Sequence, residues 1–135
     1  GQRLPMSIAA LGRGMAAHSG LSAAELRSRV SGLRWNASPS FEQYLAEVDE
    51  ARRLGDAVDR SQYVKGVTTA SAAILDSAGR PIMAISAVGF AAQLDAQAVH
   101  SLGEYLRDRA AETSRVLSGR LAVSAPRVAS AGASK

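Results

Sequence analysis

Two neighbouring segments of the chain have the side-chain pattern of β-strands, and they restrict the fold more than any other feature. Val67–Leu75 and Pro81–Val88 alternate small or β-branched residues with a period of two. The residues between them, Asp76–Gly79, have the composition of a turn. Because an isolated hairpin is only marginally stable in water, this one needs other elements to pack against. The sequence therefore predicts an α+β fold around an antiparallel hairpin, with residues 66–75 paired to 80–88.

Helices are predicted on both sides of this hairpin along the chain. Ser22 opens one of them with a capping box, Gly55 ends another in the left-handed conformation, and Asp95 caps the last, which Gly119 closes. The predicted segments are 7–17 (with Ser7 as N-cap), 22–30, 38–55 (starting at Ser38-Pro39) and 95–119. Their apolar stripes are Phe41, Tyr44, Leu45, Val48 and Leu54, then Val99, Leu102, Leu106, Ala110, Thr113 and Leu117. Residues 120–135 are small and polar, which predicts a disordered tail.

Charge and composition argue against several classes of protein. The basic residues are nearly all arginines spread from Arg3 to Arg127, so a net charge of +4 favours a solvated surface over a DNA-binding patch. No apolar run is long enough for a membrane helix, and no signal peptide is present. The absence of cysteine fits a cytoplasmic protein. His18 and His100 are far apart in sequence, so neither a metal site nor a cofactor is expected.

Catalytic chemistry finds little support in the sequence. No nucleophile has a histidine base nearby and no hydrolase or nucleotide-binding motif occurs, so no catalytic residue and no enzyme activity are predicted. Asp76 is better explained as a turn residue than as an acid or base. Asp59 follows the cap at Gly55 and leaves two alternatives open: a loop aims it inward, or it is a solvated side chain.

The side chains on the faces of the predicted hairpin are unusually small. Val67, Thr69, Ser71 and Ala73 share one face of the first strand, and Ile82, Ala84, Ser86 and Val88 share one face of the second. If these faces coincide, their low volume leaves either a ligand cavity or room for a closely packed helix. Gly12 and Gly14, inside the first predicted helix, would permit such close packing. Both interpretations carry equal weight.

A shared face requires a particular register. For Thr69 to oppose Ser86 and Val67 to oppose Val88, the loop must be even-numbered, which favours the four residues Asp76–Gly79. The competing loop, Ser77–Gly79, has an odd length. Without a compensating bulge it would place Thr69 and Ser86 on opposite faces of the sheet.

The order and spacing of several short segments resemble those of IclR-type transcriptional regulators. Arg3–Met6 and Ala10–Met15 are similar to the family's R-L-P-L-H-A-x-A-x-G-K-A-L, and Leu54–Asp59 is similar to its G-Y-x-V-D. Gly66-Val67 and Ala72–Gly79 are similar to G-V-x-C-x-A-A-P-I-x-D-x-x-G, and Ala84–Gly89 is similar to A-I-S-V-S-G. The resemblance runs from Gly1 to about Gly119.

The resemblance implies a partial effector-binding domain over residues 1–119, truncated at its N-terminal side. In this family a winged helix-turn-helix binds DNA, and a C-terminal domain with a curved antiparallel sheet binds the effector. The winged helix, the linker, and the domain's opening helix and first strands would be absent from this chain. DNA contact is then expected only through the absent domain. The expected partners are a small organic acid or aromatic catabolite and further copies of the chain in a homodimer or homotetramer, with no membrane association.

Position by position, the resemblance also implies a ligand site. Its expected residues are Ala10, Leu11, Asp59, Val67, Thr69, Ser86 and Val88. Four positions depart from the family pattern. Ser7 stands where the family has a histidine, and Thr69 stands where it has a cysteine. Val88 replaces the second serine of the S-x-S segment, and Asp56 replaces a tyrosine. Fewer polar anchors favour a larger, more apolar ligand. The leading hypothesis is a sensor whose ligand alters DNA binding, and the alternative is a dimerisation module with a closed pocket and no ligand.

Overall fold

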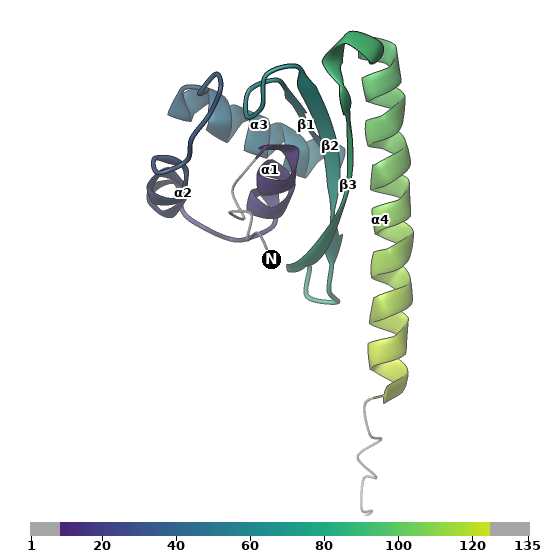
Figure 1. The fold of residues 1–135 in the computed structure, drawn as a ribbon. Coiled ribbons are helices and arrows are strands. Elements are labelled where there is room, and N and C mark those ends of the chain that lie inside the picture. Colours follow the sequence, from purple (N-terminus) through teal and green to yellow (C-terminus); the bar gives the residue numbers. More distant parts are fainter. Residues whose placement is uncertain (1–8, 125–135) are drawn as a thin grey trace, which may run out of the picture.

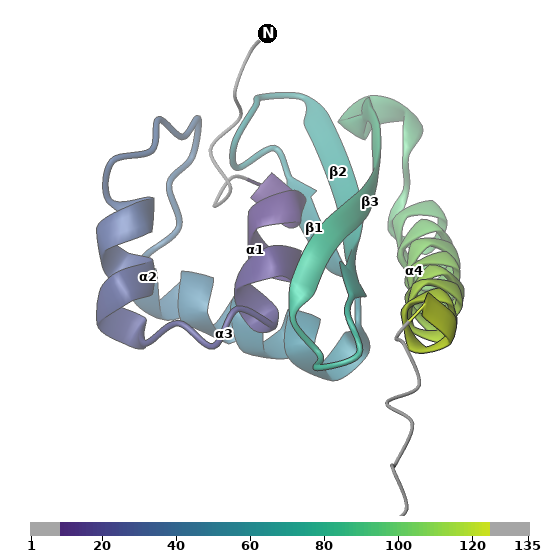
Figure 2. The same ribbon diagram turned by 90° about the horizontal axis from the view of Figure 1, so that it is seen from below.

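The computed structural model describes residues 9–124 and shows one antiparallel sheet between two layers of helices (Figure 1). The sheet has the order β1-β2-β3, with β1 at Ala57–Arg60, β2 at Val67–Leu75 and β3 at Pro81–Phe90. The helices are α1 (Ala9–Ala17), α2 (Ala23–Val30), α3 (Phe41–Leu54) and α4 (Ala96–Ser124), with a short 3₁₀ helix, η1, at Ala91–Gln93. Helices α1, α2 and α3 lie on one side of the sheet and α4 covers the other (Figures 1 and 2). The predicted α+β class with flanking helices is confirmed.

The helix ends follow local chemistry. The predicted capping box is present at α2, because Ser22 accepts from the Glu25 N–H while the Glu25 side chain accepts from the Ser22 N–H. Gly55 ends α3 with a φ of +88°, as predicted. Asp95 caps α4 by accepting a hydrogen bond of 2.7 Å from the Ala98 N–H. The N-cap predicted at Ser7 lies outside the described residues.

Two predicted helix ends were wrong. Helix α3 is capped by Ser40, whose hydroxyl accepts from the Gln43 N–H, so Pro39 precedes the cap and is not the first helical residue. Helix α4 continues past Gly119 to Ser124, since a single glycine costs a helix only about 1 kcal/mol. The tail predicted from residue 120 therefore begins inside the helix, and residues 125–135 lie outside the described part of the chain.

The hairpin register differs from the prediction by two positions. Thr69 pairs with Val88 and Ser71 with Ser86, whereas the sequence argument paired Thr69 with Ser86 and Val67 with Val88. The predicted four-residue loop was also wrong. Asp76 donates its N–H to the Arg80 carbonyl at 2.9 Å, and Gly79 adopts a φ of +76°, so the loop is Ser77–Gly79.

A β-bulge cancels the odd length of this loop. Leu75 pairs with Pro81 but Ile74 pairs with Met83, which leaves Ile82 without a partner on β2. Beside the bulge, the Leu75 N–H donates to the Ser114 hydroxyl at 2.9 Å. The extra residue restores the original alternation, so Thr69 and Ser86 lie on the same face despite the three-residue loop.

The two faces of β2 pack against different partners. On the α4 face, Ala70, Ala72 and Ile74 form a core with Leu106 and Ala110. On the α1 face the backbones come close together. A Cβ atom added to Gly14 would lie 4.0 Å from the Ser71 carbonyl oxygen and 3.9 Å from the Ala73 nitrogen. Both distances are ordinary van der Waals contacts, so α1 packs against β2 here without requiring a glycine, and the two interpretations of the small hairpin face stay open.

Candidate functional site

A row of three predicted site residues crosses the sheet on its α1 face. Asp59 on β1 is paired with Thr69 on β2, and Thr69 is paired with Val88 on β3. Sequence analysis did not anticipate β1, which places Asp59 in a strand and leaves it only 2% exposed. The inward alternative for Asp59 is therefore correct. Val88, at the other end of the row, is 71% exposed.

The remaining predicted site residues lie around this row. Ser86 lies opposite Ser71, and its hydroxyl donates to the Ser71 hydroxyl at 2.9 Å. Ala10 is completely buried in the first turns of α1, Leu11 follows it half-buried, and Val67 pairs with Phe90 at one end of the hairpin. The five strand residues of the predicted set thus share the face covered by α1. None of the three cavities described in this structure is lined by any of the seven residues.

Arg13 connects this row to α3 and was not anticipated from the sequence. Its side chain is 1% exposed, and its Nη1 lies 3.6 Å from Asp59 Oδ2. Arg13 also donates to Glu47 on α3 and to the Gln62 side chain after β1. The guanidinium lies between two aromatic rings, 5.6 Å from that of Trp35 and 5.7 Å from that of Tyr44. The sequence argument counted Arg13 among the solvated arginines. The spacing of Ala10, Arg13 and Ala17, which places them on one face of the helix, was the available signal, and all three are buried.

Several buried polar atoms gather here without a hydrogen-bond partner. Within the described part of the chain they are Arg13 Nη1, Trp35 Nε1, Tyr44 Oη, Asp59 Oδ2 and Thr69 Oγ1. Leaving such an atom buried and unpaired costs about 1–3 kcal/mol, so proteins usually satisfy it with a ligand or ordered water. The set contains two obligatory donors, one acceptor and two hydroxyls that do both.

The Tyr44 hydroxyl belongs to this cluster and is affected by its burial. Burial raises the pKa of Tyr44, with the Arg13 charge opposing that rise and Glu47 adding to it. The Tyr44 phenol is therefore neutral at neutral pH and offers one donor and one acceptor. Asp59 Oδ1 accepts from the Gln62 N–H at 2.8 Å, which fixes the orientation of the carboxylate. The cluster can therefore bind a small group that both accepts and donates hydrogen bonds.

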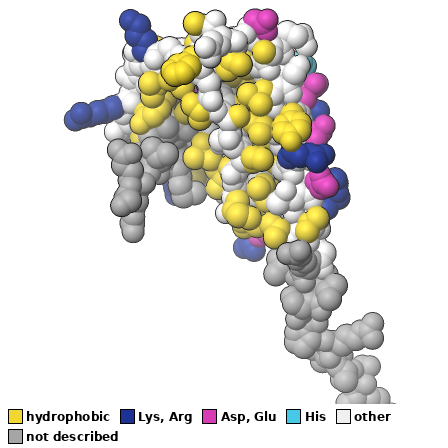
Figure 3. All heavy atoms as spheres, turned by 45° about the vertical axis from the view of Figure 1, so that its right-hand side comes forward, with side chains coloured by type: hydrophobic (Ala, Val, Ile, Leu, Met, Phe, Trp, Pro, Cys, Tyr) yellow, Lys and Arg dark blue, Asp and Glu magenta, His cyan; other side chains and the backbone are white. Residues whose placement is uncertain are grey.

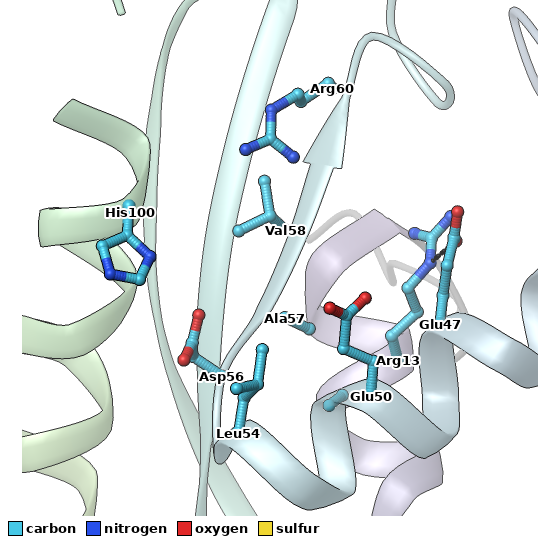
Figure 4. Close-up of a pocket in the computed structure, with 10 residues that line it drawn as sticks. Arg13, Glu47, Glu50, Leu54, Asp56, Ala57, Val58, Arg60 and His100 are labelled. Carbon is cyan, nitrogen blue, oxygen red and sulfur yellow. Dashed lines mark hydrogen bonds and ion pairs between the residues drawn. The ribbon is translucent and has the colours of Figure 1, made fainter. Parts of the chain in front are cut away.

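A second polar region lies beyond the outer edge of β1. A cavity of about 250 Å³ is bounded by α3, β1 and α4 (Figure 4). Glu50, Asp56, Arg60 and His100 are among its lining residues. Asp56 is of special interest because burial raises the pKa of its carboxyl group, against the opposing charges of Arg107 and His100. None of Asp59, Thr69 and Val88 lines this cavity, although Arg13 contacts Asp59 and also lines the cavity.

The sheet with α1 on one face and a long α4 on the other is the fold of the effector-binding domains of bacterial transcriptional regulators. The chain belongs to the family described as bacterial transcriptional regulator IclR C-terminal, whose model matches residues 1–115. The resemblance inferred from the sequence is thereby confirmed. Membership places the chain among transcriptional regulators and not among enzymes. Within residues 9–124, no helix is both long and apolar enough to span a bilayer.

Known relatives show how much of a whole regulator this chain represents. It is 36% identical to the HTH-type transcriptional repressor AllR of Escherichia coli over 73 residues. This match covers 54% of this chain and 27% of AllR. The repressor BlcR of Agobacterium tumefaciens has a similar structure, with a TM-score of 0.71, 26% identity, and coverage of 87% of this chain and 49% of BlcR. The inducer-binding domain of PobR from Acinetobacter, solved as a double mutant with 3-hydroxybenzoic acid, shares the fold. Its TM-score is 0.67 at 18% identity, and the match covers 86% of this chain and 69% of that one. The chain thus spans about a quarter of AllR and about half of BlcR.

Proposed function

We propose that this chain is the small-molecule sensor of an IclR-type transcriptional regulator acting in the cytoplasm. In this proposal a ligand bound on the α1 face of the sheet changes DNA binding by a separate domain of the same protein. Family membership supports the regulatory role, and the PobR domain solved with 3-hydroxybenzoic acid supports a small organic acid or aromatic catabolite as the ligand class.

The observation that carries this proposal is the set of unpaired buried atoms around the Asp59–Thr69–Val88 row. Thr69 and Asp59 are neighbours across β1 and β2, and both Thr69 Oγ1 and Asp59 Oδ2 lack a hydrogen-bond partner among the described residues, although Arg13 Nη1 lies 3.6 Å from Asp59 Oδ2. Structural roles usually pair such atoms, because an unpaired buried polar group weakens the fold. A hydroxyl or amide group on the ligand would donate to Asp59, while its acceptors would meet Thr69 and the Arg13 guanidinium.

Ala10 and Leu11 would contribute through the main chain. Both residues lie in the first turn of α1, whose leading N–H groups have no partner within the helix. These N–H groups and the positive end of the helix dipole favour a carboxylate. Val67, Ser86 and Val88 would border the ligand on the strands, with one hydroxyl and two apolar side chains.

A thermal-shift titration with 3-hydroxybenzoate and other small aromatic and aliphatic acids tests the proposal. A ligand that binds only the folded state adds about 2.7 kcal/mol of stability at a hundredfold excess over Kd. We expect a saturable rise in Tm that is reduced in the isosteric variant Thr69→Val. Thr113→Val is the matched control, because the Thr113 hydroxyl bonds to the Arg109 carbonyl on the exposed side of α4. Equal ligand responses in both variants would remove Thr69 from the site.

A second candidate function, as an oligomerisation module, is favoured by one observation. Strand β3 pairs only with β2 within the described residues, and it carries no charged side chain. Ile82, Met83, Val88 and Phe90 on this strand are exposed large apolar residues. Figure 3 shows hydrophobic side chains gathered beside the charged outer surface of α4. Such an edge is a template for strand pairing, as in a homodimer or homotetramer.

Light scattering separates this candidate from a monomeric sensor. If β3 mediates association, Val88→Lys should shift the chain towards the monomer, because a charge on an edge strand opposes pairing. A monomer at high concentration would leave the sensor function as the sole proposal.

We also expect no sequence-specific DNA binding by this chain alone, since its arginines are dispersed. Any retention on DNA should disappear with added salt.

A further inference from the structure

The cavity at the outer edge of β1 has features that the proposed effector site does not use. Its volume is about 250 Å³, and its lining comes from α1, α3, β1 and α4. Asp59 and its neighbours face α1, whereas Val58 packs into the core on the α4 face. By strand alternation Asp56 and Arg60 project to the same side as Val58. The cavity therefore lies around the outer edge of β1, with Asp56, Val58 and Arg60 on the α4 side and Arg13 and Glu47 on the α1 side, and none of Asp59, Thr69 and Val88 lines it.

Asp56 occupies an energetically unfavourable position for a charged side chain in this cavity. Its half-buried carboxylate forms no hydrogen bond or ion pair with the residues described here, although desolvation raises its pKa. The carboxylate also lies against Gly103 in the N-terminal third of α4, and a Cβ added to Gly103 would collide with Asp56 Oδ2. A glycine inside a helix costs about 1 kcal/mol relative to alanine. The fold thus makes room for a carboxylate on which the charges of Arg107 and His100 act, but which has no hydrogen-bond or ion-pair partner among the described residues.

The charges around the cavity are arranged with opposite signs at its two ends. In Figure 4 the Glu50 and Asp56 carboxylates lie at one end, and the Arg60 guanidinium reaches in from the other along β1. Val58 lies between them, and Leu54 lies beyond Asp56 on the side away from Arg60. Arg13 reaches the inner wall, is 1% exposed, and holds its Nη1 3.6 Å from Asp59 Oδ2. Glu47 binds the Arg13 Nε and Glu50 lies 3.8 Å from the Arg53 guanidinium, so Asp56 is the carboxylate of this lining without an ion-pair partner among the described residues.

We propose that this cavity binds a short amino carboxylate, with the ligand ammonium on Asp56 and the ligand carboxylate on Arg60. The ammonium donates to the Asp56 carboxylate, with Glu50 adding negative charge beside it. Arg60 accepts the carboxylate as a paired fork, and the apolar surface of Val58 contacts the connecting methylene groups. The cavity is smaller than the usual 300–1,000 Å³ of drug-sized pockets, which matches a ligand of amino-acid size.

Three probes of matched length test this assignment by isothermal titration: 4-aminobutyrate, butylamine and butyrate. We expect 4-aminobutyrate to bind best, butylamine to bind more weakly, and butyrate not to bind. Asp56→Asn should weaken 4-aminobutyrate binding by about tenfold or more, since a charge-assisted hydrogen bond contributes roughly 1.5–3 kcal/mol. Arg60→Gln should reduce 4-aminobutyrate to the affinity of butylamine.

Two further variants keep the test decisive. Asp49→Asn is the matched control, because Asp49 is an exposed α3 carboxylate that pairs with Arg52 outside the cavity. Gly103→Ala should displace the Asp56 carboxylate and lose amine binding without removing a charge. The proposal is overturned if butyrate binds as well as butylamine, if no amine binds, or if Asp56→Asn binds normally. Loss of amine binding in Thr69→Val would also overturn the proposal, because it would place the amine at the Asp59–Thr69–Val88 row.

Discussion

On its α4 face the sheet meets an apolar helix stripe, whereas on its α1 face it meets a buried arginine. Ala70, Ala72 and Ile74 form a buried hydrophobic cluster with Leu106 and Ala110. Around Arg13, by contrast, are all five of the buried polar atoms that lack a partner in the described chain. Helices pack on both faces of β2, so the presence of a covering helix does not distinguish the two faces. The distribution of unsatisfied polar atoms does, and it separates the face that stabilises the fold from the face available for binding.

The largest test of this comparison is Arg13→Met. Removing the guanidinium leaves Asp59 and Glu47 without their shared cation, and breaking a buried ion pair costs about 3–5 kcal/mol. Urea denaturation should show this loss, while Arg53→Met, at an exposed helix position, should stay within about 0.5 kcal/mol of the parent chain. A small effect of Arg13→Met would mean that the cluster contributes little to the fold.

Leu106→Ala tests the other face. Leu106 is buried among small side chains that cannot close the resulting gap, so the free energy of unfolding should fall by roughly 3 kcal/mol. The affinity for a ligand on the α1 face should be unchanged in protein that remains folded. A parallel loss of ligand affinity, measured by titration well below Tm, would show that the two faces are coupled.

Ser86→Val sharpens the assignment within the α1 face. It removes the hydroxyl that donates to Ser71 and borders the proposed ligand. We expect effector binding to weaken by about 1–3 kcal/mol, because a polar group of the ligand then loses its partner. Calorimetric titration of the variant measures this directly, and unchanged affinity would exclude Ser86 from the site.

The smallest expected effect concerns the pH dependence set by Asp56. Burial raises the pKa of its carboxyl group in the folded state, so ionisation destabilises the fold as pH rises through and above the ordinary value of 3.8. Asp56→Asn should therefore raise Tm at neutral pH. The gain should vanish in acid, where Asp56 is protonated in both the folded and unfolded states. Thermal melts from pH 3 to pH 7 check this, and a gain that persists in acid would contradict it.

Local chemistry made part of this structure predictable. Ser22, Gly55 and Asp95 have short-range roles as helix caps, and each has the role that its sequence context indicates. The family resemblance also placed Asp59, Thr69 and Val88 in one site, and the structure aligns them in a row. The ligand-binding role of these residues stays a prediction.

Long-range effects were harder to predict. Strand β1 has only four residues, Ala57–Arg60, and its identity depends on pairing with β2. Arg13 was missed because burial of an arginine depends on Glu47, Asp59 and two aromatic rings that are distant in the sequence. The register was missed because a loop residue and a bulge residue cancel each other, and neither is visible in the alternation alone.

That cancellation has a consequence for how this hairpin can change over evolution or in the laboratory. The Ser77–Gly79 loop and the unpaired Ile82 behave as a matched pair of odd-length insertions. Deleting one residue from the loop, or Ile82 alone, would exchange the solvent-facing and helix-facing identities of one strand relative to the other. Deleting both together would keep every facing intact. Length variation at this turn is therefore constrained to even steps, even though the turn is exposed and tolerant of sequence change.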